Sequence, residues 1–147
     1  MSSKYLNGSY PSGYRLSGVY TSVTIGTSGS IGGTGLIGSS PTNYTIVNLG
    51  TIAASVAVDA GIMLGASGTI VNGGSSDTSA YIGGAAGANN TDQNGGNGVS
   101  LAGGNVVNYG TIRGGNGVYH YEGGAGISLS ARGNIRNSGT ITGGYSL

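Results

Sequence analysis

The sequence has very few charged side chains. Of its 147 residues, five are Lys or Arg and four are Asp or Glu, which gives 6% charged residues and a formal net charge of +1. An ordinary soluble domain has about 25% charged residues. The cations are scattered and form no basic patch, which argues against nucleic-acid binding: Lys4, Arg15, Arg113, Arg132 and Arg136. Weak repulsion between copies favours self-association.

Several residue types are missing or rare. The chain has no cysteine, tryptophan or phenylalanine and only two prolines. Its longest uncharged stretch is rich in Gly, Ser and Thr, so we expect no transmembrane helix and no membrane insertion. Residues 1–5 lack the apolar core of a secretory signal. We expect an extracellular or cell-surface protein, and its export would then use no evident N-terminal signal. A cytoplasmic location is the alternative.

A short phrase recurs along the chain. Residues 108–112 read Asn-Tyr-Gly-Thr-Ile, and close copies occupy 48–52 and 137–141. Residues 27–31 are a conservative variant, and residues 72–74 resemble a copy cut short by an insertion. An internal repeat of this kind indicates that the chain is built from stacked units.

The spacing of the repeats predicts a β-solenoid. Aliphatic residues that precede the successive copies lie 21, 24, 36 and 29 residues apart, so the unit is about 20 residues long with insertions of variable length. A second phrase, of the form Gly-Ile/Val-x-Leu, begins at Gly61, Gly98 and Gly126. Each unit reads as two or three short strands joined by Gly, Asn and Ser. One unit cannot bury its own apolar face, but stacked units can.

Stacking aligns equivalent residues in ladders. We predict one apolar ladder of Ile25, Ile46, Ile70, Val106 and Ile135, and a second of Ile31, Ile52, Ile112 and Ile141. A polar ladder is expected near a corner of the coil, where asparagine tolerates left-handed backbone geometry and bonds to the next coil: Asn48, Asn72, Asn108 and Asn137. The glycine two residues after each asparagine is expected to supply a positive φ.

The expected fold is an all-β, single-domain β-solenoid of about five coils, a right-handed parallel β-helix with loop insertions on one face. Residues 1–22 precede the clear repeats and are expected to form either a first irregular coil that caps the solenoid or an arm that packs on a neighbouring molecule. Residues 23–147 hold the repeats. Within them, residues 73–97 are expected to be an inserted loop, serving either as a contact surface or as tolerated slack.

Residues that carry chemistry are sparse. His120 is the only histidine, and Glu122 is the one acid near it, two positions away as on one face of a strand. A surface pair is favoured over a catalytic pair. The acids are scattered (Asp59, Asp77, Asp92 and Glu122), so no paired carboxylates of the glycosidase kind are indicated. We predict no catalytic residue, no metal site and no cofactor.

The phrases at 107–112 and 135–141 resemble the Asn-x-Gly-Thr-Ile repeats in passenger domains of bacterial autotransporters and adhesins. The chain also resembles the solenoid regions that precede self-cleaving Hint-type domains in some secreted bacterial proteins. The resemblance covers roughly residues 23–144. It implies a β-solenoid fold, whereas such repeats serve adhesins, scaffolds and matrix fibres alike.

The leading functional hypothesis is a structural protein that polymerises head to tail, with itself as partner. An open solenoid end exposes unpaired backbone groups, and a heterologous contact that closes no ring continues as a filament. The predicted interface comprises Tyr5, Tyr10, Tyr14, Leu16, Tyr20, Ile135, Asn137, Ile141, Tyr145 and Leu147. One rival is an adhesin module that binds surface glycans or matrix polysaccharide through Tyr119 and Tyr121. The other is a polysaccharide-active enzyme that uses His120 and Glu122.

Overall fold

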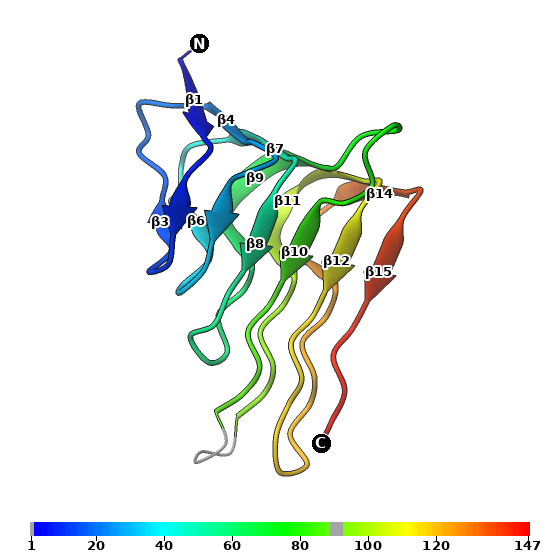
Figure 1. The fold of residues 1–147 in the computed structure, drawn as a ribbon. Coiled ribbons are helices and arrows are strands. Elements are labelled where there is room, and N and C mark those ends of the chain that lie inside the picture. The colour runs from blue at the N-terminus through cyan, green and yellow to red at the C-terminus, as the bar shows by residue number, and fades with distance from the viewer. Residues whose placement is uncertain (1, 89–92) are drawn as a thin grey trace.

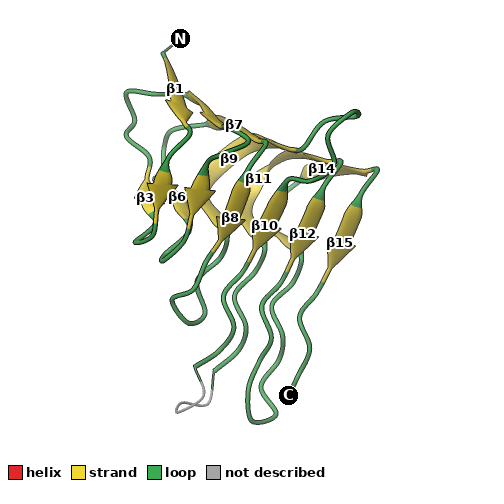
Figure 2. Ribbon diagram, viewed as in Figure 1, coloured by secondary structure: helices red, strands yellow, loops and turns green. Residues whose placement is uncertain are grey.

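The structure is a computed structural model that describes residues 2–88 and 93–147. Throughout these residues the regular structure is strand, and none of it is helix (Figure 2). Consequently, no described segment is a helix long and apolar enough to cross a membrane.

The strands form three columns of parallel pairs, which run from the N-terminal end of the stack to the C-terminal end (Figure 1). The first column contains β1 (Ser3–Leu6), β4 (Ser22–Ile25), β7 (Tyr44–Asn48), the second halves of β9 (Ile62–Asn72) and β11 (Val99–Asn108), and β14 (Gly133–Asn137). The second contains β2 (Ser9–Tyr10), β5 (Ser30–Ile31), β8 (Thr51–Ala53), β10 (Tyr81–Gly83), β12 (Thr111–Arg113) and β15 (Thr140–Thr142). The third contains β3 (Tyr14–Arg15), β6 (Leu36–Gly38), the first halves of β9 and β11, and β13 (Ile127–Leu129).

The chain visits the three columns in turn. Each visit to all three makes one coil, and five such coils are followed by a sixth with two described strands, β14 and β15. Because β9 and β11 each run from the third column into the first, these two columns form one nine-stranded sheet beside the six-stranded second sheet. The predicted all-β class and parallel solenoid architecture are confirmed.

The apolar core consists of side chains that repeat at the same register position in every coil. In the first column the aligned residues are Val23, Ile46, Ile70, Val106 and Ile135. Ile25, which the sequence placed in this ladder, pairs instead with Asn48, because the second coil has two residues more between the end of β4 and Gly29 than the third coil has between the end of β7 and Gly50. In the second column Ile31, Ile52, Ile112 and Ile141 align, and Ile82 joins them.

The predicted asparagine ladder is present, and three of its four members are buried. Asn48 donates through Nδ2 to Oδ1 of Asn72 at 2.8 Å, Asn72 donates to Asn108 at 2.8 Å, and Asn108 donates to Asn137 at 2.8 Å. The first three side chains are 0% exposed. Each Nδ2 also reaches a strand carbonyl of the next coil, so the buried amides keep their hydrogen bonds as burial requires.

The glycine two residues after Asn48, Asn108 and Asn137 serves close backbone approach, not a positive φ. Positive φ values occur at Gly13, Gly33, Gly35, Gly73 and Gly104, and at Val58, Tyr119 and His120 among other residues. Neither the ladder asparagines nor Gly50 and Gly110 are among them, so the left-handed geometry expected there is wrong. A Cβ on Gly50 would lie 2.3 Å from the Gly29 carbonyl oxygen, and one on Gly110 would lie 2.2 Å from that of Ala80.

Two ranges without a clear copy of the repeat contribute strands to the stack. Strands from residues 1–22, expected as a cap or arm, form the first coil and pair in parallel with the second. The range 73–97, expected as an inserted loop, contains β10 between β8 and β12. Part of this range, 89–92, lies outside the described residues.

Glycine-rich segments that follow the second-column strands make an additional layer, which we call the glycine layer. Residues 84–88, 93–98, 114–126 and 143–147 run side by side away from the sheets (Figure 1). Their backbones bond to one another: Gly96 donates to Ala85 at 2.7 Å, Gly115 to Gly96 at 2.8 Å, and Gly124 to Gly115 at 2.8 Å. The long insertions therefore pack on each other instead of hanging free. The insertion at 73–80 leaves from a different corner, after β9.

Candidate assembly interface

The C-terminal end of the stack carries an uncovered coil. All five residues of β14 are exposed, whereas the equivalent part of β11 alternates between buried and accessible. Ile135 shows the difference best: it is 50% exposed, whereas Val106, its partner one coil earlier, is 0% exposed. Ile135 therefore extends the apolar core to a surface that a further coil would cover.

Asn137 marks the same end by its hydrogen bonds. Earlier ladder members donate to an asparagine and to a strand carbonyl of the next coil, as Asn108 does to Asn137 and Thr140. For Asn137, the donor bond within the described residues goes to the Gly139 carbonyl of its own coil, at 3.1 Å. The side-chain amide of Asn137 therefore has a donor available to a group beyond the C-terminal end of the stack.

The other core residues near this end are only partly covered. Ile141, in β15, packs against the core cluster but is partly accessible. Ile127 and Leu129, in β13, have the same status. Strand β13 pairs with β11 on one side, and the sixth coil contributes no described strand to its other side. The uncovered surface thus spans all three columns.

The N-terminal end is finished differently. Lys4 occupies the register position of Val23 and Ile135, and its Nζ lies 5.6 Å from the ring centre of Tyr20. A charge at an inward position is one means of blunting the edge of a sheet. Leu6 takes the place that asparagine holds in later coils and is fully buried.

Aromatic rings complete this end. Tyr10 continues the isoleucine ladder of the second column, and Tyr14 begins the ladder of the third. The two rings meet edge to face, with centroids 5.1 Å apart and planes at 79°. Tyr10, Tyr14 and Tyr20 are partly buried against the core. The two ends of the stack therefore differ in chemistry.

The residues of the predicted interface fall into four groups. Ile135, Asn137 and Ile141 lie on the C-terminal coil, and Tyr5, Tyr10, Tyr14 and Tyr20 lie in or beside the N-terminal coil. Leu16 is 5% exposed and belongs to the core. Tyr145 and Leu147 join the glycine layer, where Arg113 lies 5.6 Å from the Tyr145 ring and the Leu147 backbone bonds to Gly117 and His120.

The segment around His120 is a turn, so the strand alternation inferred from sequence is wrong. Tyr119 and His120 have φ values of 52° and 72°, and Tyr121 N donates to Val118 O. Tyr119 and Tyr121 are exposed at this turn, as is His120. The described residues contain no group of three or more His, Cys, Asp and Glu side chains placed to hold a metal. Asp92 lies outside the described residues.

Asp77 shapes its own loop. Its Oδ1 accepts from the Ser79 hydroxyl at 2.6 Å and from the Ser79 backbone N at 3.1 Å. These two bonds hold the pKa of the Asp77 carboxyl below its ordinary value. The geometry is that of a local turn, which accounts for this acid without a ligand.

Three parallel columns around a buried asparagine ladder define a β-solenoid, here with one end uncovered. Comparison with protein-family models, curated proteins and solved structures gave no significant match to this chain.

Proposed function

We propose that the protein is a structural module that stacks end to end with other copies into a filament outside the cell or on its surface. The uncovered C-terminal coil is the observation that carries this proposal. Elsewhere in the stack, the next coil covers the equivalents of Ile135 and accepts hydrogen bonds from the equivalents of Asn137. At the C-terminal end, Ile135 is half exposed and the Asn137 donor points outward. The contact is head to tail, because the two ends present different chemistry.

The register of the stack indicates which residues would meet. If the parallel pairing continued into a second copy, Ile141 would meet the partner copy's Tyr10 position and Asn137 would meet the Leu6 position. Each ladder asparagine bonds a carbonyl in the next second-column strand, and in the first coil that residue is Ser9. Asn137 would therefore donate to a backbone carbonyl, whereas Leu6 supplies no amide.

Lys4 fits the same joint if its aliphatic stem covers Ile135. Long basic side chains lie along apolar surface while the charged group stays near water or an aromatic ring. The Lys4 ammonium already lies against Tyr20. A joint built in this way covers the isoleucine without burying an unpaired charge.

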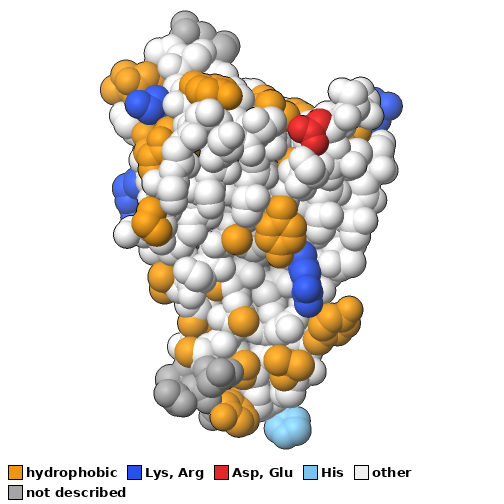
Figure 3. All heavy atoms as spheres, in the orientation of Figure 1, with side chains coloured by type: hydrophobic (Ala, Val, Ile, Leu, Met, Phe, Trp, Pro, Cys, Tyr) orange, Lys and Arg blue, Asp and Glu red, His pale blue; other side chains and the backbone are white. Residues whose placement is uncertain are grey.

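The magnitudes favour association. Fully burying an Ile side chain contributes about 1.5–3 kcal/mol, and each new backbone hydrogen bond about 1 kcal/mol. Strands β14 and β15 at the joint supply several backbone bonds together with the side chains of Ile135 and Ile141, against an association cost of about 4–15 kcal/mol. Repulsion is small because the net charge is +1, and the face seen in Figure 3 has few and separate charges.

Electron microscopy and light scattering across a protein concentration series test this function. Wild-type protein should form thin unbranched fibres, and Ile141→Asp should abolish them, because a carboxylate would then have to be buried at the joint. Thr111→Asp is the matched control: it adds the same charge one coil earlier in the same column, at an outward position beside the buried Ile112. This control should assemble normally.

A second variant guards against misfolding. Ile135→Asp changes a side chain that is already half exposed, so the fold should persist while the joint fails. Circular dichroism and thermal unfolding would verify that both variants remain folded. Normal fibres from folded Ile141→Asp and Ile135→Asp protein would rule out stacking through this end.

A further inference from the structure

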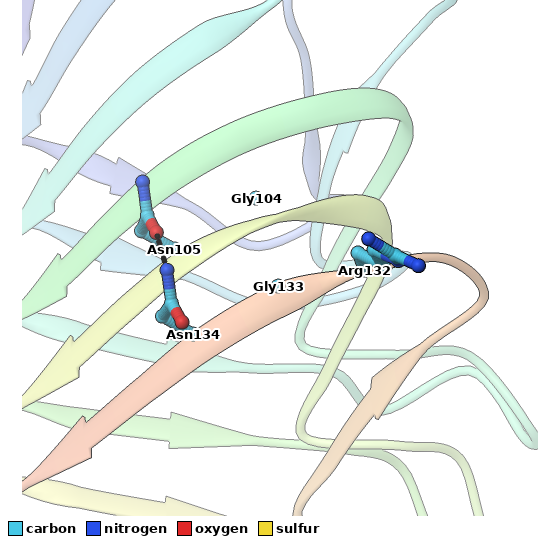
Figure 4. A pocket seen from close by; sticks show the side chains of 5 residues that line it. All are labelled: Gly104, Asn105, Arg132, Gly133 and Asn134. Atoms are coloured by element: carbon cyan, nitrogen blue, oxygen red, sulfur yellow. Dashed lines mark hydrogen bonds between the residues drawn. The ribbon is translucent and has the colours of Figure 1, made fainter.

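A polar groove crosses four coils where the third column turns into the first. Two adjoining hollows, of about 450 Å³ and about 250 Å³, share Gly104 and Asn105. Figure 4 shows the larger one, with Asn105 and Asn134 on one side of the glycines and Arg132 on the other. The groove opens on the side of the solenoid and runs along its axis.

The floor of the groove is bare backbone. Gly68, Gly104 and Gly133 align in register on successive coils. A Cβ on Gly104, which has a φ of 110°, would lie 2.0 Å from the Gly68 carbonyl oxygen, and one on Gly133 would lie 2.4 Å from that of Gly104. Glycine is thus required for the chain to turn here, because the backbone of the previous coil occupies the space that a side chain would need.

One wall of the groove is a regular column of hydroxyl and amide groups. Thr45, Thr69, Asn105 and Asn134 align on successive coils, each directly before an aliphatic residue of the first-column ladder. Coils of a β-solenoid repeat at the strand spacing of about 4.8 Å. Among the described lining residues, the side chains are joined by one hydrogen bond, from Asn134 Nδ2 to Asn105 Oδ1 at 3.2 Å. The remaining donors and acceptors are open to a ligand.

Charge selects the kind of ligand. The lining residues include one charged side chain, the exposed Arg132, and no acid. A guanidinium binds carboxylates through paired hydrogen bonds. A nucleic acid would require several cations to neutralise its phosphates. An extended peptide would require a free strand edge or apolar pockets, whereas β9 and β11 are paired on both sides and the free edge of β14 lies at the end of the stack.

We propose that this groove binds a linear acidic polysaccharide. Sugar hydroxyls would bond to the threonine and asparagine column, and a uronate carboxylate would pair with Arg132. A regular column of groups suits a ligand whose own groups repeat along its length. Part of the lining, Arg132 and Asn134, belongs to the last coil and borders the joint proposed above, whereas Thr45, Thr69 and Asn105 lie one to three coils away from it on the side of the solenoid.

Isothermal titration calorimetry on the wild-type chain tests the proposal with two probes of equal length, an oligogalacturonate and an uncharged cello-oligosaccharide. The oligogalacturonate should bind at least tenfold more tightly than the uncharged probe, and its binding should weaken as salt increases. Arg132→Ala should reduce oligogalacturonate affinity at least tenfold. Asn105→Ala should weaken the binding of this probe several-fold.

Arg15→Ala is the matched control, because Arg15 is an exposed cation on β3, away from the groove. Its affinity for oligogalacturonate should equal that of wild type. Three results would overturn the proposal: no oligogalacturonate binding at millimolar concentration, equal affinity for the uncharged probe, or an equal loss in Arg15→Ala and Arg132→Ala. An equal loss in the two arginine variants would mean that the overall charge of the protein, and not the groove, determines oligogalacturonate binding.

Discussion

At the scale of single residues, the asparagine ladder is where the fold is most exacting. Asn72 bonds to ladder neighbours on both sides, accepting from Asn48 and donating to Asn108, each at 2.8 Å. It also donates to the Thr111 carbonyl at 3.1 Å. These bonds lie in a buried setting, where an unpaired polar group is costly.

Asn72→Ala should therefore destabilise the protein by about 2–4 kcal/mol, because it leaves the Asn48 and Asn108 amides each short of a buried partner. Urea unfolding followed by circular dichroism would measure this change. Asn105→Ala is the control, because Asn105 also lies in the first column but its amide is exposed. This substitution should change the free energy of unfolding by less than about 0.5 kcal/mol. Equal effects of the two substitutions would show that the ladder contributes no more than a surface amide.

The sequence revealed this ladder because asparagine recurs beside the same glycine corner in the copies at Asn48, Asn108 and Asn137. The reason for the glycines was misjudged. Spacing alone cannot distinguish a glycine that needs a positive φ from one, such as Gly50, that allows two backbones to approach. The difference depends on which coil lies against the corner, and this emerges only from the assembled stack.

At the scale of elements, the glycine layer adds order where no apolar pattern exists. Its segments pack backbone against backbone, so a single methyl group has no room. A Cβ on Gly115 would lie 1.9 Å from the Ala85 carbonyl oxygen. Because the neighbour is main chain, no side-chain rotation can relieve the contact.

Gly115→Ala should lower the free energy of unfolding by about 1–3 kcal/mol or more, through a forced shift of two backbones. Gly74→Ala is the opposite case, because a Cβ there would meet nothing within 4 Å. At such a position alanine reduces the freedom of the unfolded chain and should stabilise by up to about 1 kcal/mol. Thermal unfolding of both variants would show shifts of opposite sign. If Gly115→Ala matched wild type, the glycine layer would not be tightly packed in solution.

The strands that the sequence predicts and those that it does not predict differ in how closely their coils keep the Asn and Ile of the repeat. Copies with both Asn and Ile, as at 137–141, were identified. The first coil carries Leu6-Asn7-Gly8-Ser9-Tyr10 at the same register, with leucine for asparagine and tyrosine for isoleucine. Gly8 and Ser9 are the residues of this copy that match the repeat and that indicate a first coil. Strand β10 was missed because an insertion separates Ile82 from the Asn72 of its coil.

At the scale of the whole molecule, stability should vary along the stack, because each coil contacts only its neighbours. Middle coils are covered on both sides, and their ladder residues Ile52, Ile70 and Ile82 are fully buried. The last coil is covered on one side only, which leaves β14 exposed along its length. Sequence patterning predicted open ends in general, whereas the contrast between Lys4 at one end and Ile135 at the other became visible only with the register.

Hydrogen exchange measured by mass spectrometry should follow this gradient. In dispersed protein, amides of β14 and β15 should exchange much faster than those of β8 and β10, since local opening is easiest where few contacts cover the backbone. On assembly, β14 and β15 should gain protection together with β1 and β2, because head-to-tail stacking pairs these two ends. The turn around His120 provides an internal reference, since it lies away from the joint and should exchange equally in both states. Protection that rose instead on the outward side of β12, with β14 unchanged, would mean that copies associate side by side and that the uncovered coil has another partner.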